Sequence, residues 1–347
     1  MLPIAVSMGE PAGIGPDIAL MAWRDRAEHR LPPFYVIGDP GLMEARAARL
    51  GIGVPVVESL PEETVETFAF GLPVVALDGS ADDRPGMPGT DTAALVIEAI
   101  RTGVEHIRAH RARAIVTNPI AKSVLAAAGF SHPGHTEFLG ELSRPFRVGP
   151  VRPVMMIWSE TLAVVPVTIH IPLADVADRL TRNLIVETGA VAAHDLRVKF
   201  GIDAPRLAIC GLNPHAGENG LIGTEDEEIV APAVAELNRI GINATGPHPA
   251  DTLFHPEARK AYDVVLGMYH DQVLVPVKTL AFDEGVNVTL GLPFVRTSPD
   301  HGTAFALAGT GRARPSSLIH AIALAGRLTA PKAAAAGSPP AVAAAST

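Results

Sequence analysis

Three histidines of this chain each follow a short apolar segment, at the point where a buried strand is expected to end. His170 follows the run LAVVPVT, His215 follows RLAIC, and His270 follows DVVLGM. Neutral imidazole is a preferred ligand of zinc, cobalt and related ions, and a site with three protein ligands keeps positions open for water or substrate. In α/β sheets ligands lie outside the carboxyl ends of strands, so this pattern indicates a divalent-metal site. The alternative is three unrelated histidines that form hydrogen bonds near turns.

Lys278, Asn287 and Arg296 each interrupt an apolar run, in VPVKTLAF, GVNVTLGL and PFVRTS. Cations and an amide in such positions suit a phosphate or a carboxylate, and arginine can bind either with two parallel hydrogen bonds. The alternative for each is a surface side chain whose apolar stem packs on the protein while its polar end reaches water.

Two further strings place polar side chains in loops. PGHTEF contains His135 and Thr136 ahead of an amphipathic segment, where Thr136 could instead cap a helix with His135 packed beside it. PADTLF places Asp251 after a short strand, as a general base, a neighbour of the metal, or an N-cap.

Two glycine-containing segments are candidates for binding an anion or a cofactor. GEPAGIGP is a strand-to-helix turn whose backbone N–H groups can approach a ligand, although a simple tight turn explains it equally well. Ser298–Gly309, SPDHGTAFALAG, runs from a loop into a helix and is a candidate nucleotide-binding segment. Neither a Walker A pattern nor G-x-G-x-x-G occurs in the chain, so a standard Rossmann fingerprint is absent.

The elements that must position these side chains alternate between short strands and longer helices. Helical patterns begin after Pro16, continue as GLMEARAARLG with Gly51 as C-terminal cap, and recur at Thr92–His110 and from about Pro119. VMMIWS and LAVVPVT are separated only by a break near Glu160, so we expect neighbouring antiparallel strands. The alternation predicts an α/β layered fold with a mixed sheet. Further buried strands are expected at Ile4–Met8, Phe34–Gly38, Ala114–Asn118, Arg206–Cys210, Asp263–Met268 and Val286–Leu290.

The composition excludes several classes of protein. The 347 residues are 48% hydrophobic and 19% charged, with a net charge of −9, which disfavours a nucleic-acid or anionic-membrane surface. One cysteine, Cys210, rules out a disulfide within the chain and fits a reducing compartment, so a cytoplasmic location is expected. No signal peptide and no spanning helix are expected. The Ala/Pro/Ser-rich segment from Thr329 to Thr347 is expected to be a disordered tail.

Taken together, the motifs resemble those of the 4-hydroxythreonine-4-phosphate dehydrogenase family of pyridoxal 5′-phosphate biosynthesis. The shared strings are GEPAGIGPD, GHTEF, GLNPHAGENG with GTE, PADTLF, YHDQ and GVNVTLGLPFVRTSPDHGTA, and they extend from Ile4 to about Leu328. Single strings are weak signals, but the combination is highly specific. The chain has Val273 where many members have glycine after YHDQ, and TNPIAK at Thr117–Lys122 where some have TGPVHK.

This resemblance implies two α/β/α layered domains with mixed sheets, related to isocitrate and isopropylmalate dehydrogenases. Residues 1–130 with 290–328 would form the first domain, and residues 131–289 the second, which would carry the metal and dimer contacts. The active site would lie in the interdomain cleft at the interface of a homodimer. The implied cofactors are NAD or NADP and a divalent metal, namely zinc, magnesium or cobalt.

The resemblance also carries roles over to individual positions. One metal ligand would come from across the dimer interface, and the ligand set is His170, His215 and His270. The implied substrate contacts are His135, Thr136, Lys278, Asn287 and Arg296. The implied cofactor loop is His301, Gly302, Thr303 and Ala304. For proton transfer, the catalytic candidates are Asp251 and Lys278.

The expected reaction is oxidation of 4-phosphohydroxy-L-threonine to 2-amino-3-oxo-4-(phosphooxy)butanoate, which decarboxylates to 3-amino-2-oxopropyl phosphate. The metal would favour the substrate alkoxide and then polarise the new ketone. The nearest alternative is a paralogous dehydrogenase for a phosphorylated four-carbon sugar acid or a dihydrodiol carboxylate. Two alternatives come from other classes: a metal-dependent hydrolase or lyase acting on a phosphoester, and a non-catalytic phosphometabolite-binding protein. The expected partners are a small phosphorylated hydroxy-amino acid and a second copy of the chain.

Overall fold

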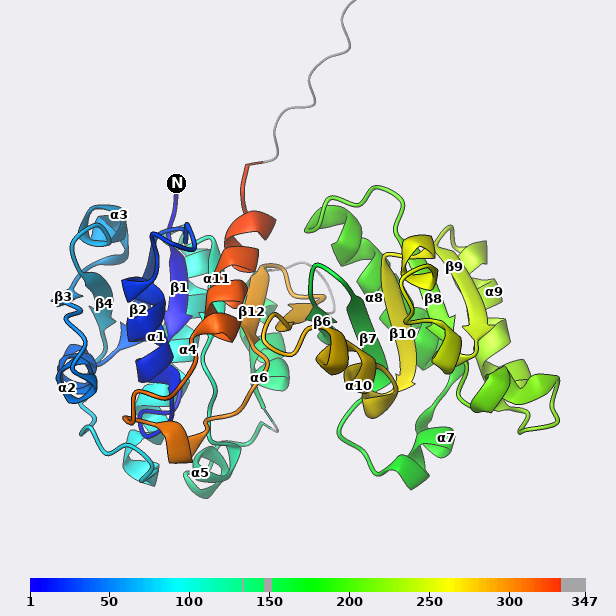
Figure 1. The fold of residues 1–347 in the computed structure, drawn as a ribbon, viewed down its shortest axis with the longest axis horizontal. Coiled ribbons are helices and arrows are strands. Elements are labelled where there is room, and N and C mark those ends of the chain that lie inside the picture. Colours follow the sequence, from blue (N-terminus) through cyan, green and yellow to red (C-terminus); the bar gives the residue numbers. More distant parts are fainter. Residues whose placement is uncertain (133, 147–151, 332–347) are drawn as a thin grey trace, which may run out of the picture.

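The strands of the chain form one continuous sheet, seen in a computed structural model that describes residues 1–132, 134–146 and 152–331 (Figure 1). Within these ranges the sheet has 12 strands. Their order across the sheet is β3 (Val56–Glu58), β4 (Leu72–Ala76), β2 (Phe34–Gly38), β1 (Ile4–Ser7), β5 (Ala114–Thr117), β12 (Val295–Pro299), β11 (Val286–Leu290), β6 (Val154–Trp158), β7 (Ala163–Thr168), β10 (Val264–Tyr269), β8 (Arg206–Cys210) and β9 (Asn243–His248).

The sheet consists of two parallel blocks joined by antiparallel strands. All neighbours from β3 to β12 are parallel, and so are the neighbours from β7 to β9. Between the blocks, β11 is antiparallel to both β12 and β6, and β6 is antiparallel to β7. The expected mixed α/β fold, with its antiparallel pair on either side of Glu160, is therefore confirmed.

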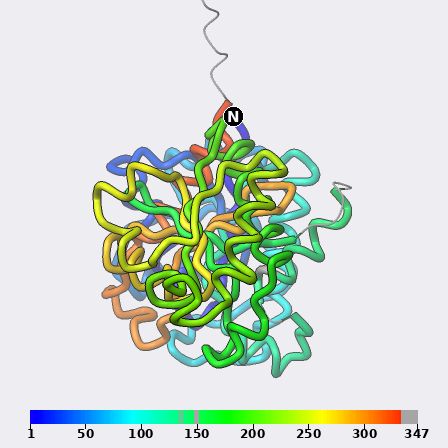
Figure 2. The backbone as a smooth tube through the Cα atoms, turned by 90° about the vertical axis from the view of Figure 1, so that its right-hand side faces the viewer, coloured from blue at the N-terminus to red at the C-terminus, as the bar shows by residue number. Residues whose placement is uncertain are grey.

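Helices cover both faces of this sheet, and the C-terminal segment returns to the N-terminal half. In Figure 1, α11 lies beside α1 and β12, and Figure 2 views the molecule from the side of the β7–β9 block. None of the helices in the described ranges is long and apolar enough to cross a membrane. The helices are α1 (Gly15–Arg24), α2 (Pro40–Leu50), α3 (Thr64–Thr67), α4 (Ala93–Arg108), α5 (Lys122–Ala127), α6 (His135–Leu142), α7 (Val176–Arg179), α8 (Arg182–Val198), α9 (Ala231–Arg239), α10 (His270–Leu280) and α11 (Ser316–Leu328).

One expected helix begins later than the sequence indicated. The proline at position 119 suggested a helix from that point, but α5 begins at Lys122. The reason is that the Pro119 carbonyl accepts a hydrogen bond from the backbone N–H of Glu10, at 2.9 Å, and Ala121 has an extended backbone. The connection after β5 thereby anchors the glycine-rich turn after β1.

Other local expectations agree with the structure. The side chain of Asp39 caps α2 by accepting from the N–H of Gly41 at 2.8 Å, and Gly51 ends this helix at φ 64°. The division into domains at residues 130 and 290 stays a prediction. Backbone hydrogen bonds of β11 with β12 and with β6 join the two blocks into one sheet. The expected tail lies outside the described residues from position 332 onward.

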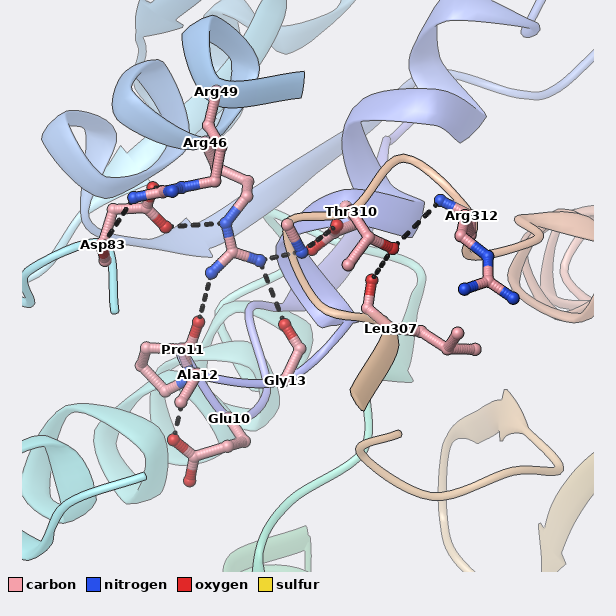
Figure 3. Close-up of polar contacts among 12 residues, drawn as sticks. Glu10, Pro11, Ala12, Gly13, Arg46, Arg49, Asp83, Leu307, Thr310 and Arg312 are labelled. Atoms are coloured by element: carbon pink, nitrogen blue, oxygen red, sulfur yellow. Dashed lines mark hydrogen bonds and ion pairs between the residues drawn. The ribbon is translucent and has the colours of Figure 1, made fainter. Parts of the chain in front are cut away.

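A buried arginine holds the glycine-rich turn in place (Figure 3). Arg46, on α2, is fully buried and forms ion pairs with Asp17 and Asp83. Its Nη2 donates to the Pro11 carbonyl at 2.8 Å and its Nη1 to the Gly13 carbonyl at 3.1 Å. Asp17 also accepts from the N–H of Gly309 at 2.7 Å, so this network ties the turn to the segment after β12.

Replacing this arginine should be strongly destabilising. Arg46→Met is expected to lower the free energy of unfolding by about 3–5 kcal/mol, because it leaves the buried carboxylate of Asp17 without its cation. Urea unfolding would measure the loss. Arg49→Met is the matched control: Arg49 also pairs with Asp83, but its side chain is 46% exposed, and the expected change is below about 1 kcal/mol. Equal losses in the two variants would contradict the assignment.

Candidate active site

A cavity of about 640 Å³ lies where the two parallel blocks of the sheet meet. One side of the cavity is lined by β5 and β12 of the first parallel block and by the antiparallel strand β11. The other side is lined by the residues that follow β7 and β10 of the second block. Eight of the residues predicted to form the site line this one cavity: His135, His170, His270, Lys278, Asn287, Arg296, His301 and Gly302.

Arg296 supplies a buried positive charge to the cavity. It lies on β12 and is 3% exposed. Its Nε and Nη2 donate to the hydroxyl of Thr117 at 3.1 and 2.6 Å, and its Nη1 donates to the hydroxyl of Thr289 at 2.8 Å. Within residues 1–132, 134–146 and 152–331, no carboxylate pairs with it. Burial lowers the pKa of Arg296 to about 10, so the guanidinium remains protonated at neutral pH.

His135 is the first residue of α6, and its Nε2 is buried without a hydrogen-bond partner in the described structure. Burial, with smaller contributions from Arg296 and Lys122, holds the pKa of His135 well below its usual value. The imidazole is therefore neutral and has an unused polar atom for a ligand. The side chain of Thr136, its predicted companion, lies outside the described part of the structure.

This low pKa has a measurable consequence for stability. An unfolded histidine takes up a proton as the pH falls below its ordinary pKa of 6.5, whereas folded His135 does not. The free energy of unfolding should therefore fall as the pH drops through this range, by at most about 1.4 kcal/mol per pH unit. His135→Gln should lose less stability than the wild type between about pH 7 and pH 5.5 in urea unfolding experiments. Identical pH slopes would mean that His135 is protonated in the folded protein.

Lys278, on α10, is held by an ion pair that the sequence did not indicate. Its ammonium group forms an ion pair with the carboxylate of Asp300 and donates to the Asp300 carbonyl at 2.8 Å. Asp300 comes directly after β12 and also lines the cavity. The charge of Lys278 is therefore largely balanced by this carboxylate. Asn287, on the neighbouring strand β11, contributes its amide to the same cavity.

Two of the three predicted metal ligands meet at the cavity. The rings of His170 and His270 have centroids 5.6 Å apart. Burial lowers the pKa of His170, and Lys122 and His270 lower it further, which favours the neutral imidazole that binds metal. The Nδ1 of His270 lies 2.7 Å from the carboxylate of Asp271, and a hydrogen bond there leaves Nε2 free for a ligand.

His215 does not join this pair within one chain. It lies after β8 in η5 (Pro214–Glu218) and is exposed. No group of three or more His, Cys, Asp or Glu side chains in the described residues is placed to hold a metal ion. A single subunit therefore supplies two of the predicted ligands to one place and presents the third on its surface.

The backbone around His215 is strained in a specific way. His215, Ala216, Glu218 and Asn219 have φ values between 45° and 56°, and Gly217 and Gly220 are also in the left-handed region. Each such non-glycine residue costs roughly 1–2 kcal/mol, so the surrounding structure must hold the turn. The carboxylate of Asp226, 1% exposed, accepts from the backbone N–H groups of Leu212 and Asn213 at 2.7 and 3.0 Å. Strain of this kind is concentrated at functional sites.

Asp251, predicted as a general base, lies outside the cavity. It is exposed in η7 (Ala250–Thr252), which contacts η5 and thus the segment that carries His215. The structure therefore divides the predicted site residues into a cavity group, which contains His170 and His270, and an exposed group, which contains His215 and Asp251.

The predicted cofactor loop borders the cavity and the glycine-rich turn. His301 and Gly302 line the cavity, and the Thr303 carbonyl accepts from the N–H of Ile14 at 3.0 Å. Ala304 has φ 44°. The buried Nε2 of His301 has no partner in the described structure.

Reasoning from the sequence missed several residues of the cavity, among them Thr117, Lys122 and Asp300. Thr117 and Lys122 are the ends of the string TNPIAK, which stood out only as a departure from a family pattern. Asp300 lies inside a string that was assigned to cofactor binding. For Thr117 and Asp300 the useful signal was the position at the end of a buried strand, whereas Lys122 lies at the start of α5.

The fold and this cavity define a class of protein: an α/β protein with a cavity whose buried cation suits a small anionic molecule. The sequence profile of the family described as "Pyridoxal phosphate biosynthetic protein PdxA" matches residues 30–325. A protein from Xanthobacter autotrophicus named 4-hydroxythreonine-4-phosphate dehydrogenase is 58% identical over 94% of this chain and 93% of its own. The chain therefore belongs to this PdxA family.

Other relatives agree with this assignment. A protein of the same name from Bradyrhizobium diazoefficiens is 53% identical, over 95% of this chain and 98% of its own. The crystal structure of 4-hydroxythreonine-4-phosphate dehydrogenase from Klebsiella pneumoniae superposes with a TM-score of 0.83 at 36% identity, over 94% and 98% of the two chains. A terephthalate 1,2-cis-dihydrodiol dehydrogenase from Burkholderia xenovorans gives a TM-score of 0.62 at 26% identity, over 93% and 97% of the chains.

Proposed function

We propose that this chain is an NAD(P)- and divalent-metal-dependent dehydrogenase for 4-phosphohydroxy-L-threonine. Its product, 2-amino-3-oxo-4-(phosphooxy)butanoate, would decarboxylate to 3-amino-2-oxopropyl phosphate, in pyridoxal 5′-phosphate biosynthesis. The observation that carries the proposal is the buried, protonated Arg296, which has no carboxylate partner among the described residues and lies in the cavity that also holds His170 and His270. A phosphorylated substrate supplies the negative charge that this arrangement lacks.

The histidine pair fits a divalent metal in part. Two imidazoles whose ring centroids are 5.6 Å apart can direct one nitrogen each to a common ion, and zinc, cobalt or magnesium are the candidates. When bound, such an ion would lower the pKa of the substrate alcohol and polarise the ketone that replaces it. The missing third protein ligand is His215 of a second copy of the chain.

The exposed apolar residues support such a homodimer. A large apolar side chain that is more than half exposed accompanies each histidine along the chain: Leu173 after His170, Leu221 after His215, and Val275 after His270. Contiguous apolar patches mark interaction surfaces, whereas single exposed apolar side chains are common, and we propose that these three are covered together in one contact. A two-fold contact that covers them would bring the exposed group of one subunit, with His215 and Asp251, to the cavity of the other.

The side chains of the cavity have distinct tasks in this proposal. Arg296 binds the anionic end of the substrate, and neutral His135 and Asn287 orient its remaining polar groups. Asp251 of the partner subunit takes the proton of the alcohol at a carboxylate oxygen. Lys278 holds a proton on Nζ, with its charge balanced by Asp300, and donates it to the product after CO₂ is lost.

A nicotinamide cofactor fits at the segment 301–304. The buried Nε2 of His301, which has no partner among the residues that the structure describes, offers a polar contact, and Ile14 and Thr303 join this loop to the glycine-rich turn. When bound, the nicotinamide would supply the acceptor for the hydride of the substrate. The single thiol, Cys210, is buried and free, which supports the proposed cytoplasmic location.

The proposal is tested with dialysed protein, 4-phosphohydroxythreonine, NAD or NADP, and a series of divalent metals. We expect reduced cofactor and CO₂ to appear together, only when a metal is restored. Phosphorylated four-carbon sugar acids and dihydrodiol carboxylates serve as alternative substrates, and a higher kcat/KM with one of these would identify a paralogous dehydrogenase. Phosphate release without cofactor reduction would instead support a hydrolase.

A further inference from the structure

In the part of the chain that the structure describes, the guanidinium of Arg296 is held by neutral groups only. Its partners, Thr117 and Thr289, lie on β5 and β11, the two strands that pair with β12 on either side. Thr117 is fully buried and Thr289 is 2% exposed. Thr117 is the more important partner, because its single hydroxyl oxygen accepts from both Nε and Nη2.

Two N–H bonds of the Arg296 guanidinium remain available to a ligand. A guanidinium has five N–H bonds, of which one on Nε, one on Nη2 and one on Nη1 are used. One N–H therefore remains on each terminal nitrogen, and this pair matches two oxygens of an oxyanion. Hydroxyl groups orient the guanidinium without neutralising it, whereas a carboxylate in the same place would cancel the charge that the ligand needs.

We propose that Thr117 is a positioning residue, which aims the two remaining N–H bonds of Arg296 at the phosphate of the substrate. This inference rests on the proposed function and deepens it. Thr117 and Arg296 both line the cavity. A phosphate dianion fits better than a carboxylate, because Lys122 lines the cavity as a second cation without an ion pair in the described ranges, while Lys278 is paired with Asp300. Glu137 also lines the cavity, and it pairs with neither Arg296 nor Lys122 in those ranges.

Thr117→Val removes the hydroxyl and keeps the shape of the side chain, whereas Thr117→Ser keeps the hydroxyl. Thr117→Val should raise KM for the phosphorylated substrate about tenfold or more, with a smaller change in kcat, and Thr117→Ser should remain within about threefold of the wild type. Thr297→Val is the matched control. Thr297 is also fully buried, lies next to Arg296 on β12, and donates to the Ala321 carbonyl at 2.8 Å, away from the cavity.

Direct binding of inorganic phosphate, measured by calorimetry, makes the test independent of catalysis. We expect Thr117→Val to weaken phosphate binding about tenfold, and Thr117→Ser and Thr297→Val to leave it nearly unchanged. If the wild type binds phosphate in this pattern but shows no dehydrogenase activity, the inference stands and the proposed function fails.

Unphosphorylated 4-hydroxythreonine, used as a competing ligand, distinguishes phosphate from carboxylate. Its affinity should be the same in the wild type and in Thr117→Val. An equal loss for both ligands would assign Arg296 to the carboxylate and overturn the proposal. Unchanged phosphate binding in Thr117→Val, or a failure of Thr117→Ser to retain it, would overturn it as well. Circular dichroism confirms that each variant is folded.

Discussion

His215→Ala and His270→Ala should each lower metal-dependent turnover by about a thousandfold or more, because the bound ion contributes several kcal/mol of charge stabilisation in the transition state. Neither histidine is buried, so the free energy of unfolding should change by less than about 1 kcal/mol. Turnover after dialysis and return of the metal, together with the metal content of each variant, measures the effect. His29→Ala, an exposed histidine elsewhere, is the control.

Mixing the two inactive variants gives a sharper result. If His215 and His270 of one site come from different subunits, a mixed dimer contains one complete site and one site that lacks both histidines. Random reassortment of equal amounts should then restore about one quarter of the wild-type activity. If all three histidines of a site belonged to one chain, each mixed site would lack one ligand and activity would not return. Near-normal activity of either variant alone would refute the metal assignment.

Arg296→Met should raise KM for the phosphorylated substrate by about a hundredfold or more, because each charge-assisted hydrogen bond contributes roughly 1.5–3 kcal/mol and two are lost. The same variant should be as stable as the wild type or more stable. It replaces a buried cation that has no carboxylate partner in the described ranges by an apolar side chain of similar length. Steady-state kinetics and thermal unfolding of one preparation measure both effects.

Arg314→Met provides the control for this prediction. Arg314 is exposed and pairs with Asp283, so its removal should change neither KM nor thermal stability appreciably. An unchanged KM in Arg296→Met would argue against an anion-binding role. A loss of stability comparable to that in Arg46→Met would mean that Arg296 serves the fold and not the ligand.

Much of the fold was predictable from local pattern. The strands at Phe34–Gly38, Arg206–Cys210 and Val286–Leu290 have the predicted limits, because each is a short segment of mostly apolar residues that are largely buried in the sheet. The predicted start of α5 at Pro119 was wrong. The Pro119 carbonyl instead accepts a hydrogen bond from Glu10, which lies more than one hundred residues earlier in the chain. Such contacts leave no periodic trace in the sequence.

The site was predictable in its residue types but not in its geometry. Position after a strand indicated His170 and His270, which do meet at the cavity. The same reasoning placed His215 and Asp251 with them, and it could not foresee that a left-handed turn presents His215 on the surface. Arg296 was identifiable as a cation in an apolar run. Its threonine partners were not, since a threonine in a β-strand is common for reasons of propensity alone.

The continuous sheet also limits how the protein can move. Strands β12, β11 and β6 cross the region between the two parallel blocks and are joined by backbone hydrogen bonds. A flexible linker would allow one block to swing on a hinge, but a hydrogen-bonded sheet resists bending at a single point. Any widening of the cavity must therefore spread over these strands as a change of twist. Entry and exit of the substrate would then depend on the loops around the cavity, whose motions are faster and cost less energy than a distortion of the sheet.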